Sequence, residues 1–253
     1  MGHIFDLKSA KLYKEWLSSP GGVLLDKLST DLIVRLVKPK RGERILDVGC
    51  GTGNHLLLFH KLGLDVTGID ASPYMLDMAK SRLGSKASLK ISMADDLPFE
   101  DNEFDISTLI VTLEFIDNPL AVLKEVGRVT KDRVFVGVLN YLSFGCISKK
   151  IISLFNDSIF RETHLFSLWG IREDIKKAYG NTLIEWGSVQ TMPTFFFKEY
   201  ARRIEMSPLT QSYPFGTFIG ISAKMMYTLR AEGITIGKEL KKGAESLVGS
   251  PGF

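Results

Sequence analysis

The feature that most constrains this sequence is an alternation of short β-branched runs with amphipathic helical stretches between Arg44 and Leu139. Such alternation is typical of repeated strand–helix–strand units, which form a parallel sheet covered by helices. We therefore expect an α/β, Rossmann-like fold whose seven-stranded, mostly parallel sheet has helices on both faces. Ligands of such sheets bind beyond the carboxyl ends of the strands.

The expected strands are Arg44–Val48, Asp65–Ile69, Ser88–Met93, Phe104–Val111, Arg133–Leu139, Thr182–Thr191 and Gly216–Met226. Residues typical of helix ends mark the segments between them. Ser72 precedes Pro73, and Gly84 follows eleven residues after Pro73, which is the order of an N-cap, a first helical residue and a C-terminal stop. Ser167 and Gly180 delimit a later helix in the same way.

The length of 253 residues fits one large domain at 1–230 with a polar tail at 231–253. Within the domain we expect N-terminal helices at 1–41, a binding core at 42–139 and inserted segments at 140–166 and 192–215. Tyr141–Phe166 and Pro193–Met206 are apolar and break the regular alternation. We expect these two segments to form a cap over the carboxyl ends of the strands, and the first to contain helix of its own.

Composition excludes several classes of protein. The 32 basic and 29 acidic residues give a net charge of +3 without a dense basic patch, so nucleic-acid binding is not indicated. Cys50 and Cys146 form no metal or disulfide pattern, so both are expected to be packed thiols and no metal site is predicted. No signal peptide or membrane span is found. A cytoplasmic protein without integral membrane association is the resulting expectation.

The heptapeptide that begins at Asp47, DVGCGTG, carries the clearest chemical signal. Its alternate glycines, Gly49, Gly51 and Gly53, follow an expected strand and let a ligand approach the backbone closely. A dinucleotide fingerprint would place its third glycine at position 54, which is Asn54. The acid of Asp47 also suits a ligand with a positive amino group, whereas it would repel a pyrophosphate at the helix N-terminus.

Two further acidic positions follow in order along the chain. Asp70 ends the second expected strand, where a carboxylate can accept hydrogen bonds from both hydroxyls of a ribose. Asp95 follows the third expected strand. Together with Phe104–Asp105, Asn118–Pro119 and the segment LKEVGRV that starts at Leu123, these elements resemble the class I S-adenosylmethionine-dependent methyltransferases. The resemblance covers about residues 42–139 and is strongest to the type 11 group, which contains the ubiquinone and menaquinone methylases.

This resemblance implies S-adenosyl-L-methionine as the cofactor and a set of residues that hold it. The methionine part would contact Asp47, Gly49, Cys50, Gly51 and Gly53. The ribose would contact Asp70 and Ala71, and the adenine would contact Asp95, Asp96 and Leu97. Tyr13, in a short aromatic motif before the core, would close over the methionine end.

The reaction implied is methyl transfer by in-line displacement, for which alignment alone can contribute about 7–11 kcal/mol. Many relatives carry a histidine pair after the fourth strand, but this chain has Glu114 there. Glu114 is either a substrate-facing carboxylate or the partner of a basic group, and His164 either a base or a structural histidine. His55 and His60 are expected to be surface or packing residues.

The acceptor is expected to be a small apolar or aromatic molecule. The aromatic residues Phe195, Phe196, Phe197 and Tyr200 would line its pocket, or else belong to the core or to a subunit contact of a homodimer. Two other functions stay open: a cofactor-binding regulatory or scaffold protein without methyl transfer, and an NAD(P)-dependent oxidoreductase on a similar sheet.

Overall fold

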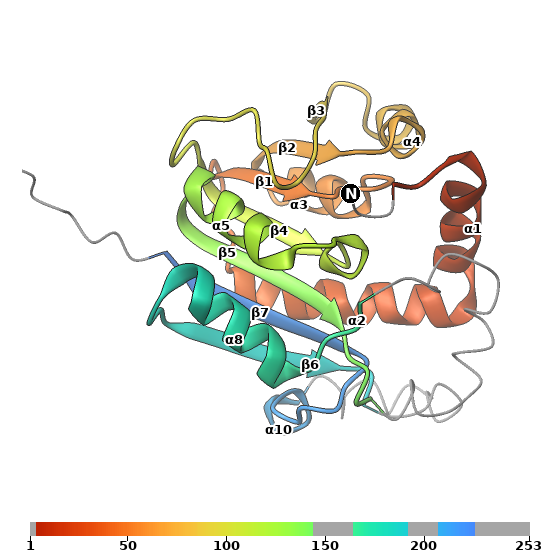
Figure 1. Cartoon of the computed structure of the whole chain (residues 1–253). Helices are drawn as coiled ribbons and strands as arrows, with labels where there is room; N and C mark the ends of the chain where they lie inside the picture. The colour runs from red at the N-terminus through yellow and green to blue at the C-terminus, as the bar shows by residue number, and fades with distance from the viewer. Residues whose placement is uncertain (1–3, 144–163, 192–206, 226–253) are drawn as a thin grey trace, which may run out of the picture.

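The computed structural model of the chain describes residues 4–143, 164–191 and 207–225 (Figure 1). The strands are β1 (Arg44–Val48), β2 (Asp65–Asp70), β3 (Ser88–Ile91), β4 (Phe104–Ile110), β5 (Thr130–Leu139), β6 (Ile184–Val189) and β7 (Phe218–Lys224). They form one sheet in the order β3-β2-β1-β4-β5-β7-β6. Strands β1 to β5 are parallel, whereas β7 is antiparallel to both β5 and β6. The predicted seven-stranded, mostly parallel sheet is confirmed.

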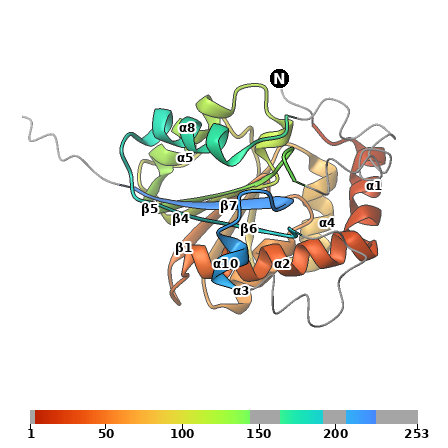
Figure 2. The same cartoon turned by 90° about the horizontal axis from the view of Figure 1, so that it is seen from below.

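The helices are α1 (Leu7–Ser18), α2 (Pro20–Val37), α3 (Asn54–Lys61), α4 (Pro73–Leu83), the 3₁₀ turn η1 (Leu113–Phe115), α5 (Pro119–Val129), α8 (Leu168–Tyr179) and the single turn α10 (Pro208–Gln211). Figure 2 shows α5 and α8 on one face of the sheet and α2 and α3 on the other. The alternation along β1 explains both layers: Leu46 and Val48 pack in the cluster of α5 and α8, and Ile45 packs in the cluster of α2, α3 and α4.

Among the described strands, all except β1 have bounds that differ from the predicted ones by one to three residues at an end, and two of these differences can be explained. β3 ends at Ile91 rather than Met93, because the chain turns away after Ser92, whose hydroxyl donates to the carbonyl oxygen of Asp96. β5 begins at Thr130 rather than Arg133, because Thr130 already pairs with Phe104 across an irregularity in the register of β4. Local propensity does not reveal such pairings, since they depend on the neighbouring strand.

Of the two N-terminal helices, α1 lies at the end of the sheet where ligands bind and α2 covers one face of the sheet. Asp6 caps α1 by accepting from the backbone N–H of Ser9, and Ser19 caps α2 ahead of Pro20. α2 packs its buried Leu32 against the sheet beside β5, β6 and β7. α1 stands beyond the carboxyl ends of the strands (Figures 1 and 2). The N-terminal part therefore adds a wall to the region in front of β1 and β4.

The ends of the two inserted segments meet at Asn140, which is fully buried. Its side-chain amide donates to the carbonyl oxygens of Pro214 and Gly216, both at 2.9 Å, and its oxygen accepts from the backbone N–H of Leu142 at 3.1 Å. The exit of β5 is thereby fixed to the approach to β7. The middle of the expected cap, including Cys146, Phe195, Phe196, Phe197 and Tyr200, and the C-terminal tail lie outside the described residues.

Within the described ranges, no helix is both long and apolar enough to cross a membrane. The same ranges contain no group of three or more His, Cys, Asp or Glu side chains arranged to hold a metal ion.

Replacing Asn140 with Ala should lower the free energy of unfolding by about 2–4 kcal/mol, because one buried and two half-buried backbone groups lose their partner. Urea denaturation followed by circular dichroism measures this change. Asn181→Ala, at an exposed position before β6, is the matched control and should change stability little. An equal, small effect of both substitutions would show that Asn140 does not hold the two connections together.

Candidate active site

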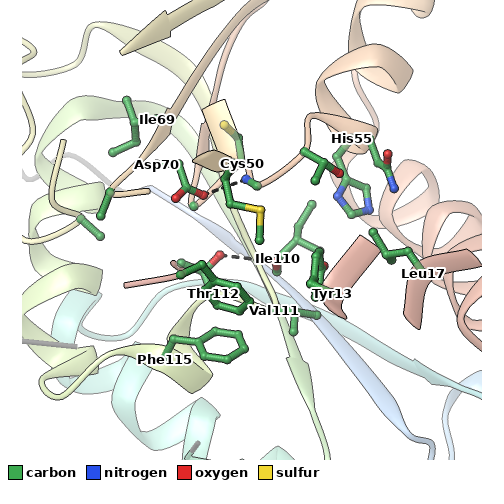
Figure 3. A pocket seen from close by; sticks show the side chains of 18 of the residues that line it. Tyr13, Leu17, Cys50, His55, Ile69, Asp70, Ile110, Val111, Thr112 and Phe115 are labelled. Carbon is green, nitrogen blue, oxygen red and sulfur yellow. Dashed lines mark hydrogen bonds between the residues drawn. The ribbon is translucent and has the colours of Figure 1, made fainter. Parts of the chain in front are cut away.

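A cavity lies at the carboxyl ends of β1, β2 and β4, where the fold predicts a ligand site (Figure 3). Its described walls come from the glycine loop after β1, the end of β2, the segment after β3, the turn after β4 and the N-terminal helices. Those walls include Gly51, Asp70, Ala94, Thr112 and Tyr13. The cavity therefore joins segments that are far apart in the sequence.

The three glycines of the loop all have positive φ angles, 73° at Gly49, 52° at Gly51 and 77° at Gly53. An added Cβ at Gly49 would approach the Thr112 side chain to 2.4 Å, and one at Gly53 would approach Leu83 to 2.8 Å. An added Cβ at Gly51 would meet nothing within 4 Å. Gly49 and Gly53 are thus required for packing as well as for conformation, whereas Gly51 faces the open space of the cavity.

Asp70 fixes the loop to the end of β2. Its Oδ2 accepts from the backbone N–H of Gly51 and its Oδ1 from that of Ser72, both at 2.8 Å. Burial raises the pKa of Asp70, and these two hydrogen bonds oppose the shift. A carboxylate has about four lone-pair positions, so both oxygens can also accept from a ligand in the cavity.

Asp47 lies behind the glycine loop and is 2% exposed. Its Oδ1 accepts from the hydroxyl of Thr108 at 2.6 Å, and it is not among the described residues that line the cavity. Burial raises the pKa of Asp47 to about 7, against the effect of the Thr108 hydrogen bond. Cys50 and Ala71, in contrast, do line the cavity, and burial raises the pKa of the Cys50 thiol well above its usual value.

The segment after β3 contributes different residues from the expected ones. Ser92, Met93 and Ala94 line the cavity. Asp95 and Asp96 are exposed to solvent and Leu97 is buried in the core, so the described lining includes none of these three. The backbone N–H of Leu97 donates to Glu125 on α5, which directs the chain away from the cavity.

Tyr13 lines the cavity from α1, as the sequence predicted for a residue near the ligand. Its ring lies 5.8 Å from that of Phe5 and 5.9 Å from that of Trp16. Phe5 in turn contacts Phe115 edge to face at 4.9 Å, and its carbonyl oxygen accepts from the hydroxyl of Ser72 at 2.6 Å. The N-terminal segment is thereby held against the segments that follow β2 and β4.

The family comparison agrees with this geometry. Residues 46–136 match the model of a family described as a methyltransferase domain. This part of the chain is similar to the methyltransferase domain of that family. Over 97 residues it is 40% identical to a demethylmenaquinone methyltransferase of Staphylococcus aureus strain JH9, in a match that covers 36% of this chain and 40% of that protein. The chain thus spans less than half the length of the curated relatives that it matches.

Solved structures of distant sequence share the methyltransferase fold. An S-adenosylmethionine-dependent methyltransferase from Thermotoga maritima has a TM-score of 0.65 at 21% identity, over 87% of this chain and 97% of that one. Phosphoethanolamine N-methyltransferase 2 of Haemonchus contortus, in complex with S-adenosyl-L-methionine, has a TM-score of 0.60 at 20% identity, over 87% and 57%. The [4+2]-cyclase SpnF has a TM-score of 0.57 at 21% identity, over 79% and 80%.

Glu114 and His164 lie together beside the methyltransferase cavity, and the described lining includes neither. Glu114 is fully buried; its Oε1 accepts from the backbone N–H of Leu139 at 2.6 Å, and its Oε2 has no hydrogen-bond partner among the described residues. Burial raises the pKa of Glu114 to about 8, with the Leu139 bond opposing the shift. The backbone N–H of His164 donates to the carbonyl oxygen of Glu114, while His164 itself is exposed.

Two polar residues of the cavity were not predicted. Asp26 on α2 and His55 in the first turn of α3 both line it. His55 is therefore a cavity residue rather than only a surface or packing residue, whereas His60, one turn later, is exposed as expected. The signal for His55 is its place directly after the glycine loop, in the helical turn that faces the ligand side. No local pattern marks Asp26, because only the packing of α2 brings it there.

The buried carboxyl of Glu114 should make stability depend on pH. Its pKa is about 8 in the folded chain but near its ordinary value of 4.5 when unfolded, so the folded state binds more protons between these values. Stability contributed by the neutral carboxyl is therefore lost as the pH rises from about 4.5 to 8. Glu114→Gln should gain stability relative to wild type over that interval. Urea denaturation at pH 5 and pH 8 measures the difference, and an equal difference at both pH values would contradict the shift.

Proposed function

We propose that this protein transfers a methyl group from S-adenosyl-L-methionine to a small apolar or aromatic acceptor. The observation that carries the proposal is the pairing of Gly51, which opens onto the cavity, with Asp70, whose carboxylate bonds to the backbone of that glycine. Both lie within the methyltransferase segment at 46–136. The pairing gives a close backbone approach and an acceptor for ribose hydroxyls in one place.

The residues present fit the cofactor. Asp70 would accept from the ribose, the backbone at Gly51 would lie against the sulfur side, and Met75, Met93 and Ala94 would flank the adenine. Carboxylates without a Lys or Arg in the described lining suit a cationic sulfonium compound. When bound, the cofactor supplies a strongly electrophilic methyl group, so the protein mainly has to align the acceptor and exclude water.

The walls around the remaining space favour an apolar or aromatic acceptor. Val111, Phe115 and Ile116 from the turn after β4 and Leu17 from α1 form much of that surface. Phe5 and Tyr13 close it toward solvent, which excludes water from the reacting groups. The segments 140–166 and 192–215 are proposed to complete the acceptor pocket. The demethylmenaquinone methyltransferase of S. aureus, whose name indicates a quinone acceptor, is consistent with this choice.

A proton on the acceptor would leave toward η1. Glu114 is the proposed base, since its unpartnered Oε2 and raised pKa suit proton uptake near neutral pH, and His164 is the second candidate. The homodimer and the cytoplasmic location stay predictions from the sequence.

One alternative function is favoured by a specific observation. SpnF shares the fold and is named as a [4+2]-cyclase, so the fold is compatible with functions other than methyl transfer. A cofactor-binding protein that acts as a regulator or scaffold is therefore the second candidate. The NAD(P)-dependent oxidoreductase is less favoured, because Asn54 stands where the third glycine of a dinucleotide site belongs.

Methyl-labelled S-adenosyl-L-methionine and a panel of phenols, quinols, amines and carboxylic acids test the proposal. We expect label in a phenol or quinol with the wild-type protein, and none with Gly51→Val, whose branched side chain would occupy the cavity and oppose a φ of 52°. Circular dichroism checks that the variant folds. Binding of S-adenosylhomocysteine without transfer to any acceptor would favour the regulatory alternative, and binding of NADPH in its place would favour the oxidoreductase.

Asp70→Asn should weaken the binding of S-adenosylhomocysteine by about 1.5–3 kcal/mol, because charge-assisted hydrogen bonds to the ribose are lost and the amide nitrogen cannot accept from a backbone N–H. Isothermal titration calorimetry measures the affinity. Asp77→Asn, on the exposed side of α4, removes the same charge outside the cavity and is the control. Affinity that is the same in both variants would remove Asp70 from the site. Asp95→Asn, measured alongside, tests the adenine contact expected from the sequence.

A further inference from the structure

The cavity has a second polar end, formed by Asp26 of α2 and His55 of α3. Figure 3 shows His55 and Asp70 on opposite sides of Cys50, with His55 next to Leu17 of α1. Asp26 and α1 precede residue 46, so they lie outside the segment that matches the methyltransferase family. Asp26 is thus a residue of this polar end that the family match does not cover, whereas His55 lies within the matched segment.

His55 has an unused hydrogen-bonding atom at this end. Its Nε2 is buried and has no partner among the described residues. Burial lowers the pKa of His55, and the negative charge of Asp26, which lines the same cavity, opposes that shift. A buried ring nitrogen without a partner is unfavourable, so a ligand group that reaches it gains a hydrogen bond that the protein alone does not make.

The charges around His55 select the kind of ligand group. Asp26 and Asp70 are the carboxylates of the described lining, and that lining contains no Lys or Arg. The acid expected to face an amino group, Asp47, lies behind the loop and bonds to Thr108. Asp70 already accepts two backbone N–H groups. Asp26 is therefore the lining carboxylate with the most capacity to take a positive charge.

Aromatic rings complete this end. Tyr13 and Trp16 are stacked with an interplanar angle of 29°, and both line the cavity. Ring faces attract cations, most strongly where water is excluded. A primary ammonium group is small, carries three donors and can bond to a carboxylate and to an imidazole nitrogen at once.

We propose that Asp26 and His55 form an ammonium-binding subsite at the end of the cavity away from Asp70. This inference rests on the proposed function, because it assumes that the same cavity holds the cofactor. The ammonium comes either from the amino-acid end of the cofactor or from an amine on the acceptor. The chemistry of recognition is the same in both cases.

The binding of two nucleosides to the full chain, measured by calorimetry, tests whether the cofactor supplies the ammonium group. S-adenosylhomocysteine carries the ammonium group, and 5′-methylthioadenosine has the same nucleoside and sulfur without the amino-acid end. Asp26→Asn and His55→Leu should weaken binding of the first compound by about tenfold or more and that of the second by less than about twofold. His55→Gln should retain most of the affinity, because its amide can still accept, and Asp77→Asn should behave as wild type.

Tyramine, an aromatic amine, tests the second source. If the acceptor brings the ammonium, tyramine should bind the protein saturated with S-adenosylhomocysteine, and Asp26→Asn should abolish that binding without changing nucleoside affinity. The subsite is overturned if folded Asp26→Asn and His55→Leu bind all three compounds as wild type does, or lose both nucleosides equally. Wild-type protein that binds neither nucleoside would contradict the proposed function, and tyramine binding to the free protein would then decide the subsite.

Discussion

Three hydrogen bonds fold the glycine loop back onto the end of β2, and the cavity depends on them. The backbone N–H groups of Gly49 and Cys50 donate to the carbonyl oxygen of Ile69 at 2.9 and 2.8 Å, and that of Gly51 donates to Asp70. This path requires positive φ angles, which only glycine adopts at low cost. The parallel pairing of β1 with β2 places donors and acceptors opposite one another. A ligand at Gly51 therefore meets a backbone that is already held in place.

The acids that follow one another along the chain have different surroundings, and this gives them different properties. Asp47 is enclosed behind the loop, Asp70 is at the cavity surface, and Asp95 is in solvent. Burial raises the pKa of Asp47 to about 7, so this side chain carries less negative charge at neutral pH than an exposed carboxylate does. Its position favours a structural hydrogen bond to Thr108 over direct contact with a charged ligand.

The N-terminal helices add walls to the site at the carboxyl ends of the strands. Ser72 and Phe5, 67 residues apart, are joined by a hydrogen bond, and Phe5 packs on Phe115 beyond β4. α1 and α2 bring aromatic rings and Asp26 to a cavity whose other wall is the methyltransferase core. Residues 46–136 match the family model, whereas the N-terminal helices precede the matched segment.

The sequence by itself determined the sheet, its helices and the place of the site, because hydrophobic periodicity and glycine spacing are local signals. Gly51, Asp70 and Tyr13, which the sequence predicts to hold the cofactor, line the cavity, and the sequence located the helix that starts at Pro73 from its caps. The homodimer, the acceptor and the role of Glu114 stay predictions. Only the tertiary structure decided which side chains reach the cavity. Asp26 and His55 are there, and Asp47 and Asp95 are not, since burial and direction depend on packing between segments that no local pattern records.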